Sequence, residues 1–279
     1  MTVYPLLIHL GAFTITGYGI MMMVAFLTAG WAYAGELRRR GLDGAIAWDT
    51  VVVAVIGGLA GSKIYYGIAT GRIAAALARG GLVWYGGLVG GALAVLAYVW
   101  LKKLPLRVIL DAIAPSLVIG YMLGRVGCFS VNDDYGLPSH LPWAVAFPQG
   151  SPPTTAAYLT AQFHVALPPG TLPTQLLTVQ PTELYEIALS FLILWLLLRW
   201  RGHSHAPGWL FGLYLALSSL ERFLVEFVRA KDDRLPGNIT VAQIESLILL
   251  LVAIGLMAAW WRNRGATVTD QNSTSPTTQ

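Results

Sequence analysis

Charged residues are scarce in this chain of 279 residues. Asp, Glu, Lys and Arg together make up 11% of it, whereas a typical soluble domain holds about 25%. Hydrophobic residues make up 56%, and the mean hydropathy is +0.61. This composition excludes an ordinary soluble enzyme and a disordered protein. The 18 basic residues are not gathered into one patch, which excludes a nucleic-acid binder. The composition is instead that of a polytopic membrane protein.

Cysteine is nearly absent as well, since Cys128 is the single one, and no disulfide can form within the chain. No Lys or Arg precedes Arg38, so we do not expect a cleaved signal peptide, which begins with a positive region. His203 and His205 form an HxH pattern without further ligands nearby, so we expect no metal site.

Long apolar runs are abundant. A helix needs about 20 mostly apolar residues to cross a hydrocarbon core of about 30 Å. We therefore expect an all-α polytopic membrane protein with seven transmembrane helices, at residues 14–34, 48–69, 82–101, 107–126, 180–198, 209–229 and 240–261. Within the second and third of these, the pairs Gly57-Gly58 and Gly90-Gly91 are typical of helix-packing seams.

The distribution of basic residues predicts the orientation in the membrane. Residues 126–198 contain no Lys or Arg. The opposite set of loops holds the basic residues Arg38, Arg39, Arg40, Lys102, Lys103, Arg107, Arg199, Arg201, Arg262 and Arg264. Because cytoplasmic loops carry an excess of Lys and Arg, we expect the N-terminus outside and the C-terminus in the cytoplasm.

Two segments differ in composition from the spans. Residues 129–179 hold more than half of the 15 prolines, which predicts a small extracytoplasmic head of turns and short elements. This head is inserted in a transmembrane domain of residues 1–264. Residues 265–279 are polar and predict a disordered cytoplasmic tail.

Arginines fall in the outer half of the predicted spans, where an ionisable side chain indicates function because its desolvation is unfavourable. Arg222, Glu226 and Arg229 are spaced i, i+4, i+7, which predicts one shared helix face. Arg125 ends the fourth span at the same depth, and Glu186 lies in the fifth. One interpretation is a structural ion pair. The other is anion binding, since three arginines exceed the acids needed to pair them and guanidinium forks match phosphate oxygens. At this depth the anion would be a phospholipid headgroup reached from the outer leaflet.

Six segments resemble, in order, the motifs of bacterial prolipoprotein diacylglyceryl transferases. They are ITGYG at 15–19, GGLVWYGGLVGG at 80–91, GRVGCFSVNDDYG at 124–136, QPTELYE at 180–186, ERFLVEFVR at 221–229 and AQIES at 242–246. The resemblance implies a seven-helix enzyme of the bacterial inner membrane that acts in lipoprotein maturation. Such an enzyme transfers the diacylglyceryl group of phosphatidylglycerol to the lipobox cysteine of a prolipoprotein and releases glycerol phosphate. It implies no metal and no organic cofactor.

The same resemblance assigns the site residues. It implies the catalytic residues Arg125, Arg222, Tyr85 and Glu226, and the substrate-binding residues Tyr18, Gly124, Gly127, Asp133, Gly136, Glu186, Arg229 and Gln243. From their positions, Tyr18, Tyr85 and Gln243 each lie about one turn inside an outer helix end.

The chain departs from the family pattern at several positions. Tyr85 and Gln180 stand where most of the family has histidines, Cys128 and Val131 replace asparagines, and Asp133 approximates a glutamate. These changes leave the general base open between Glu226, Glu186 and a water molecule. They also leave two alternative functions, an anionic-phospholipid binding or transport protein and a transferase with a different acceptor. A covalent role for the Cys128 thiol is a further alternative.

Overall fold

The computed structural model describes residues 1–10, 13–71, 83–202, 206–230 and 239–262. These residues form one antiparallel hairpin and eight helices: β1 (Leu7–Leu10), β2 (Phe13–Thr16), α1 (Gly17–Arg39), α2 (Ala45–Ala69), α3 (Trp84–Leu101), α4 (Leu106–Val131), α5 (Ala156–Phe163), α6 (Thr182–Trp200), α7 (Trp209–Val225) and α8 (Val241–Arg262). His203, His205, the expected tail at 265–279 and the start of the motif at 80–91 lie outside the described residues.

The all-α fold class is confirmed, whereas the expected count of seven membrane spans is not. Five helices are long and apolar enough to cross a membrane: α1, α2, α3, α4 and α8. Helix α6 carries Glu183, Glu186 and Arg199 within its 19 residues, and α7 has only 17 residues. The first expected span also starts too early, because residues 14–16 belong to strand β2, which pairs with β1 from Leu7↔Thr16 to Leu10↔Phe13.

The chain divides into two compact units, with the divisions inside α1 and α4. Unit 1 consists of Met1–Thr28 and Leu117–Gln279, and unit 2 of Ala29–Ser116.

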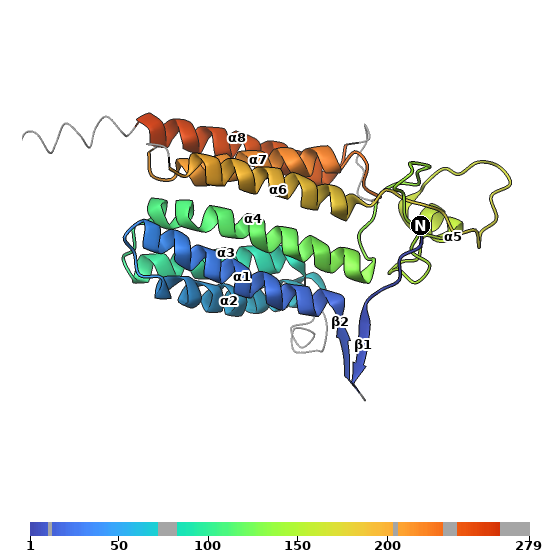
Figure 1. The fold of residues 1–279 in the computed structure, drawn as a ribbon, viewed down its shortest axis with the longest axis horizontal. Coiled ribbons are helices and arrows are strands. Elements are labelled where there is room, and N and C mark those ends of the chain that lie inside the picture. Colours follow the sequence, from blue (N-terminus) through green and yellow to red (C-terminus); the bar gives the residue numbers. More distant parts are fainter. Residues whose placement is uncertain (11–12, 72–82, 203–205, 231–238, 263–279) are drawn as a thin grey trace, which may run out of the picture. The chain divides into compact units, whose positions relative to one another are not determined.

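Unit 2 is built on a close glycine contact between α2 and α3, which lie side by side in Figure 1. A Cβ atom added to Gly61 would lie 2.7 Å from the Cα of Gly90, and one added to Gly91 would lie 3.7 Å from the Cα of Gly58. Only glycine permits this approach of two backbones. The predicted packing seam is therefore confirmed.

One end of unit 2 contains its apolar core. Tyr33, Leu37, Val99 and Ile109 are fully buried there, and Leu104 packs against them. At the same end, Arg40 closes α1 by donating to Glu36 and to the backbone carbonyl of Asp111, the latter at 3.2 Å.

In unit 1, helices α6, α7 and α8 pack in sequence order, α6 against α7 and α7 against α8 (Figure 1). Ile193 and Leu197 of α6 bury their side chains with Leu210 of α7 and Val118 of α4.

Residues 129–179 of unit 1 contain the end of α4, the short helix α5, turns and isolated β-bridges. Phe147 is fully buried at their centre, stacked on Tyr135 with ring centroids 5.6 Å apart. The N-terminus joins this segment, because the N–H of Val3 donates to the carbonyl of Ala146 at 2.9 Å.

Candidate active site

Asp134 joins two of the arginines in unit 1. Its Oδ2 accepts a hydrogen bond from Nη1 of Arg125 at 2.8 Å, and its Oδ1 accepts one from Nε of Arg229 at 2.9 Å. Nη2 of Arg229 also donates to Oδ2. Because Asp134 lies in the turn that follows α4, it ties the end of that helix to the segment after α7.

Glu186 provides a second shared carboxylate, one turn into α6, and its side chain is 1% exposed. Tyr121 donates to its Oε1 at 2.9 Å, and Nε of Arg125 lies 3.0 Å from its Oε2. The ring of Tyr121 also faces the Arg125 guanidinium, 4.9 Å from centroid to Cζ. Arg125 is therefore held by two carboxylates and an aromatic ring.

Arg222 is the most accessible of the three arginines. Its Nη2 pairs with Oε2 of the buried Glu226 at 2.8 Å, and its Nη1 lies 3.7 Å from Glu186. The Arg222 side chain is 27% exposed, compared with 16% for Arg125 and 7% for Arg229. It is therefore the guanidinium best placed to meet a ligand.

The expectation that Arg222, Glu226 and Arg229 share one helix face is wrong for Arg229. Helix α7 ends at Val225, and Arg229 instead forms an antiparallel β-bridge with Gly136. The N–H of Leu137 donates to the carbonyl of Val228 at 2.8 Å, which draws the chain out of the helix. Backbone pairing with a distant segment overrides the local i, i+4, i+7 pattern.

The expected excess of arginines over acids is also wrong. Asp134, Glu186 and Glu226 already pair with the three arginines. Glu183 and Glu221 add two further buried carboxyl groups to unit 1. The number of arginines therefore does not indicate a bound anion. The feature that favours anion binding is instead the accessibility of the Arg222 side chain.

Close packing explains two of the predicted site glycines. A Cβ on Gly127 would lie 3.2 Å from Cδ2 of Tyr18, so the absence of a side chain lets Tyr18 lie directly against α4. A Cβ on Gly136 would lie 2.5 Å from the carbonyl oxygen of Val228 and 2.8 Å from Thr182. Gly136 thus allows three chain segments to meet beside Asp134. At Gly124 the nearest atom is Sδ of Met22, at 4.0 Å.

Asp133 and Cys128 lie next to this network. Burial raises the pKa of the Asp133 carboxyl, and the neighbouring Asp134 raises that pKa further. Sγ of Cys128 lies 3.8 Å from Nη1 of Arg125. Of the two adjacent aspartates, it is Asp134 that pairs with the arginines.

The remaining predicted residues have local roles in the structure. Gln243 and Thr240 form a reciprocal cap at the start of α8: the Gln243 Oε1 accepts from the Thr240 N–H at 3.0 Å, and the Thr240 Oγ1 accepts from the Gln243 N–H at 3.2 Å. Tyr85 belongs to unit 2, where it lies in the first turn of α3 and meets the ring of Trp84 edge-on at 5.2 Å.

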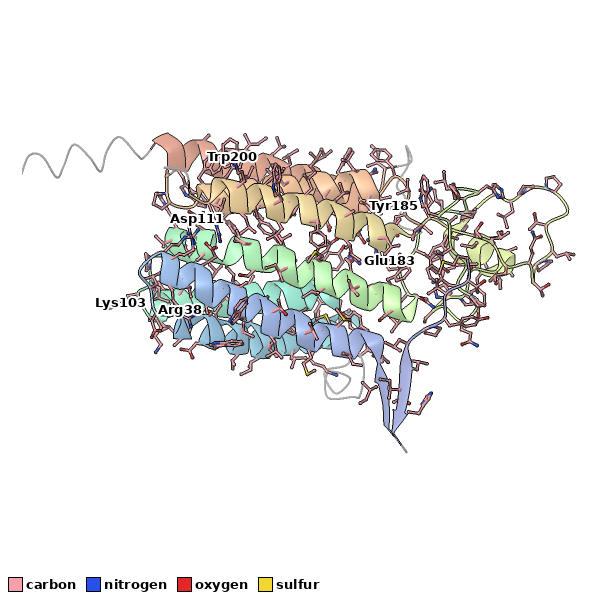
Figure 2. All side chains as sticks on the ribbon, viewed as in Figure 1. Arg38, Lys103, Asp111, Glu183, Tyr185 and Trp200 are labelled. Atoms are coloured by element: carbon pink, nitrogen blue, oxygen red, sulfur yellow. The ribbon has the colours of Figure 1, made fainter. Side chains whose placement is uncertain are left out.

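Sequence reasoning missed four polar residues: Tyr121, Asp134, Glu183 and Glu221. Signals for three of them were present. Tyr121 precedes Arg125 by four residues, Glu183 precedes Glu186 by three, and Asp134 directly follows Asp133. Glu183 is completely buried, and within the described part of the chain neither of its carboxylate oxygens has a hydrogen-bond partner. Figure 2 labels it at the start of α6, near Tyr185, whose Oη accepts a hydrogen bond from Trp143 at 2.7 Å.

The described residues do not form a recognisable metal site. Among the residues that the structure describes, no three His, Cys, Asp or Glu side chains are grouped to hold a metal ion. The chemistry available is that of arginines, carboxylates and tyrosine hydroxyls.

Comparison with known proteins identifies the family. The family model described as prolipoprotein diacylglyceryl transferase matches residues 5–260. Three relatives carry the name phosphatidylglycerol–prolipoprotein diacylglyceryl transferase. The protein from Trichormus variabilis is 30% identical over 92% of this chain and 89% of its own length; that from Vibrio cholerae is 30% identical over 94% and 92%; and that from Paraburkholderia phytofirmans is 33% identical over 94% of each. The chain therefore belongs to the prolipoprotein diacylglyceryl transferase family.

Proposed function

We propose that this chain transfers the diacylglyceryl group of phosphatidylglycerol to the lipobox cysteine thiol of a prolipoprotein. The sulfur forms a bond to the carbon of the diacylated glycerol that carries the phosphate ester. The bond between this carbon and the phosphate oxygen breaks, and the other glycerol leaves as glycerol phosphate. The thiol gives up its proton. The family match over residues 5–260 supports the reaction, and the partly exposed Arg222 carries the assignment of the site.

The arginines stabilise the leaving group. Negative charge grows on the phosphate oxygen as the ester bond breaks, and a guanidinium aimed at it lowers the barrier. We assign this contact to Arg222, with Arg125 behind it. Arg229 donates to Asp134 and positions it. Its predicted role in substrate binding is therefore indirect, since Arg229 holds Asp134 and does not contact the phosphate.

The thiol loses its proton near these arginines. A free thiol has a pKa of about 8.5, and neighbouring positive charge favours the thiolate. We assign the proton to Glu226 or to a water molecule beside it, because Glu226 pairs with the most accessible arginine. Glu186 is the weaker candidate for the base, since Tyr121 and Arg125 already occupy both of its oxygens.

The remaining predicted site residues complete the proposal. Tyr18, lying against Gly127, would contact the glycerol or phosphate of the donor from α1. Tyr85 would orient a substrate oxygen, because a neutral tyrosine with a pKa near 10 is a poor base. Gly124, Asp133, Gly136 and Gln243 would shape the substrate site.

For the membrane topology, we propose seven spans, with α6 and α7 crossing in addition to the five apolar helices. Glu186 of α6 and Arg222 of α7 are paired within unit 1, which removes much of the desolvation penalty of these two side chains. The N-terminus would lie outside and the C-terminus in the cytoplasm of the bacterial inner membrane. Residues 129–179 would form an extracytoplasmic head on a transmembrane domain of residues 1–264.

Purified full-length protein, phosphatidylglycerol and a lipobox peptide would test the reaction. We expect the peptide mass to increase by one diacylglyceryl group, with release of an equal amount of glycerol phosphate. A peptide with serine in place of cysteine should remain unmodified. If the cysteine peptide also stays unmodified while phosphatidylglycerol still binds, the acceptor is different or the protein only binds lipid.

A Cys128→Ser variant tests the covalent alternative in the same assay. We expect it to keep turnover, because the acceptor thiol attacks the lipid directly. Loss of turnover in a variant that still folds, together with a diacylglyceryl adduct on Cys128 of the parent protein, would instead establish a two-step mechanism.

A further inference from the structure

Unit 2 has a hollow of about 510 Å³ at the turn between α3 and α4, at the opposite end of α3 from Tyr85. This volume is within the range of small-ligand pockets, about 300–1,000 Å³. Its lining consists of Leu96, Val99, Trp100, Leu101, Lys103, Leu104 and Leu106. All of these except Lys103 are apolar.

The geometry of α3 gives the hollow its direction. Leu96 and Trp100 are spaced i, i+4, so they lie on one face of α3, and Lys103 follows in the turn after the helix ends at Leu101. Val99 is 3% exposed and belongs to the core of unit 2, so it forms the floor. Trp100 is 77% exposed, as expected of an aromatic residue at the interface between membrane and water. The apolar track therefore runs along α3, which is long and apolar enough to cross a membrane, and ends at Lys103.

Lys103 occupies a backbone position that favours glycine. Its φ is 52°, in the left-handed region. Its N–H donates to the carbonyl of Trp100 at 3.0 Å, and the N–H of Leu104 donates to that of Val99 at 2.9 Å. This pair of bonds is the helix ending in which the left-handed residue is usually glycine. This chain therefore has a lysine at a position where the backbone conformation favours glycine.

Lys103 is the one charged side chain in the lining of the hollow, and among the described residues no carboxylate lines it. Lys102 and Arg107 lie close to Lys103 in the sequence. Within the described parts of the chain, no carboxylate forms an ion pair with Lys103. Figure 2 shows Lys103 and Arg38 at the same end of unit 2. A ligand that fits this surface combines a hydrocarbon chain with a negative headgroup.

We propose that this hollow is a second phospholipid site, which binds an anionic phospholipid without reacting with it. One acyl chain lies along Leu96 and Trp100, and the phosphate is held by the ammonium of Lys103. Basic pockets at the cytoplasmic ends of membrane helices bind anionic headgroups in this way. The placement of the site in the cytoplasmic leaflet rests on the proposed orientation of the chain. The preference for an anionic phospholipid does not depend on that orientation.

The test is photo-crosslinking of the full-length protein in phosphatidylcholine nanodiscs that contain a small fraction of phosphatidylglycerol with a photoreactive acyl chain. We expect labelling of the peptide that spans residues 96–106, mapped by mass spectrometry. The same probe with a phosphatidylcholine headgroup should label that peptide at least fivefold less. Labelling near Arg222 reports the candidate active site separately, so the two proposals can fail independently.

Two matched variants assign the headgroup contact. Lys103→Gln should reduce phosphatidylglycerol labelling of the 96–106 peptide to the phosphatidylcholine level. Lys102→Gln removes the same charge from a neighbour that does not line the hollow, and it should leave the labelling unchanged. Both variants should keep transferase activity. Equal labelling by both probes, or equal losses in both variants, would overturn the proposal and leave a surface that holds any acyl chain.

Discussion

Arg229 and Asp134 form a two-pronged ion pair, in which Nε donates to Oδ1 at 2.9 Å and Nη2 donates to Oδ2. This geometry sets one side of the planar guanidinium against both oxygens of one carboxylate, while Nη1 lies 3.9 Å from Glu186. Arg222 makes one short contact, to Glu226, and keeps more than a quarter of its side chain exposed. Arginines that look equivalent in the sequence therefore differ in the structure: Arg229 is held on both sides of the Asp134 carboxylate, and Arg222 is left more accessible.

Asp134→Asn should destabilise the protein strongly. The substitution leaves Arg125 and Arg229 without their shared carboxylate, and breaking a buried pair costs about 3–5 kcal/mol. The measurement is the free energy of unfolding in mixed detergent micelles. Asp133→Asn is the matched control, because within the described residues Asp133 has no arginine within ion-pair distance, and its loss should be much smaller. Equal losses for both aspartates would contradict the assignment of Asp134 as the central carboxylate.

Arg222→Gln should reduce turnover by about 10²–10³-fold, the usual effect of removing one donor to a developing negative charge. Its effect on stability should be smaller than that of Asp134→Asn, because Arg222 is partly exposed. Arg222→Lys should recover part of the rate, since it keeps the charge but loses the fork. Steady-state rates and thermal denaturation of the same preparations separate the two effects. Turnover near that of the parent protein in Arg222→Gln would remove this residue from the phosphate contact.

The sequence allowed much of the site to be predicted, because most of its residues lie in contiguous motifs on helices. Arg125, Glu186 and Glu226 are where the helical pattern places them, within one network. The predictions that were wrong concern features that depend on pairing between distant segments. The bridge between Gly136 and Arg229 ends α7 early, and nothing within residues 209–229 signals it. The choice of Asp134 over Asp133 depends on the direction of the turn after α4, which is set by the same bridge.

Tyr85 tests how far the chain has diverged from the family pattern. Tyr85→Phe should slow turnover, because it removes the hydroxyl that would orient a substrate oxygen. Tyr85→His should be tolerated if the position simply replaces the family histidine. The measurement is the initial rate of diacylglyceryl transfer, with thermal denaturation as the control for folding. A folded but inactive histidine variant would show that the site has been rebuilt around tyrosine.

Gly61→Ala should separate α2 from α3. The new Cβ would lie 2.7 Å from the Cα of Gly90 and 3.1 Å from its nitrogen, and neither backbone atom can rotate away as a side chain would. Such overpacking costs about 1–3 kcal/mol.

Gly35→Ala in α1 is the matched control for Gly61→Ala. Among the described residues, no atom other than the neighbouring backbone of α1 itself lies within 4 Å of a Cβ built at Gly35. There the change should stabilise the helix by about 0.5–1 kcal/mol, because alanine loses less backbone freedom on folding. The two substitutions are chemically identical, both lie in helices of unit 2, and they are expected to change the free energy of unfolding in opposite directions. The same sign for both would mean that the contact between α2 and α3 yields to a methyl group, and that the glycines there serve a purpose other than close packing.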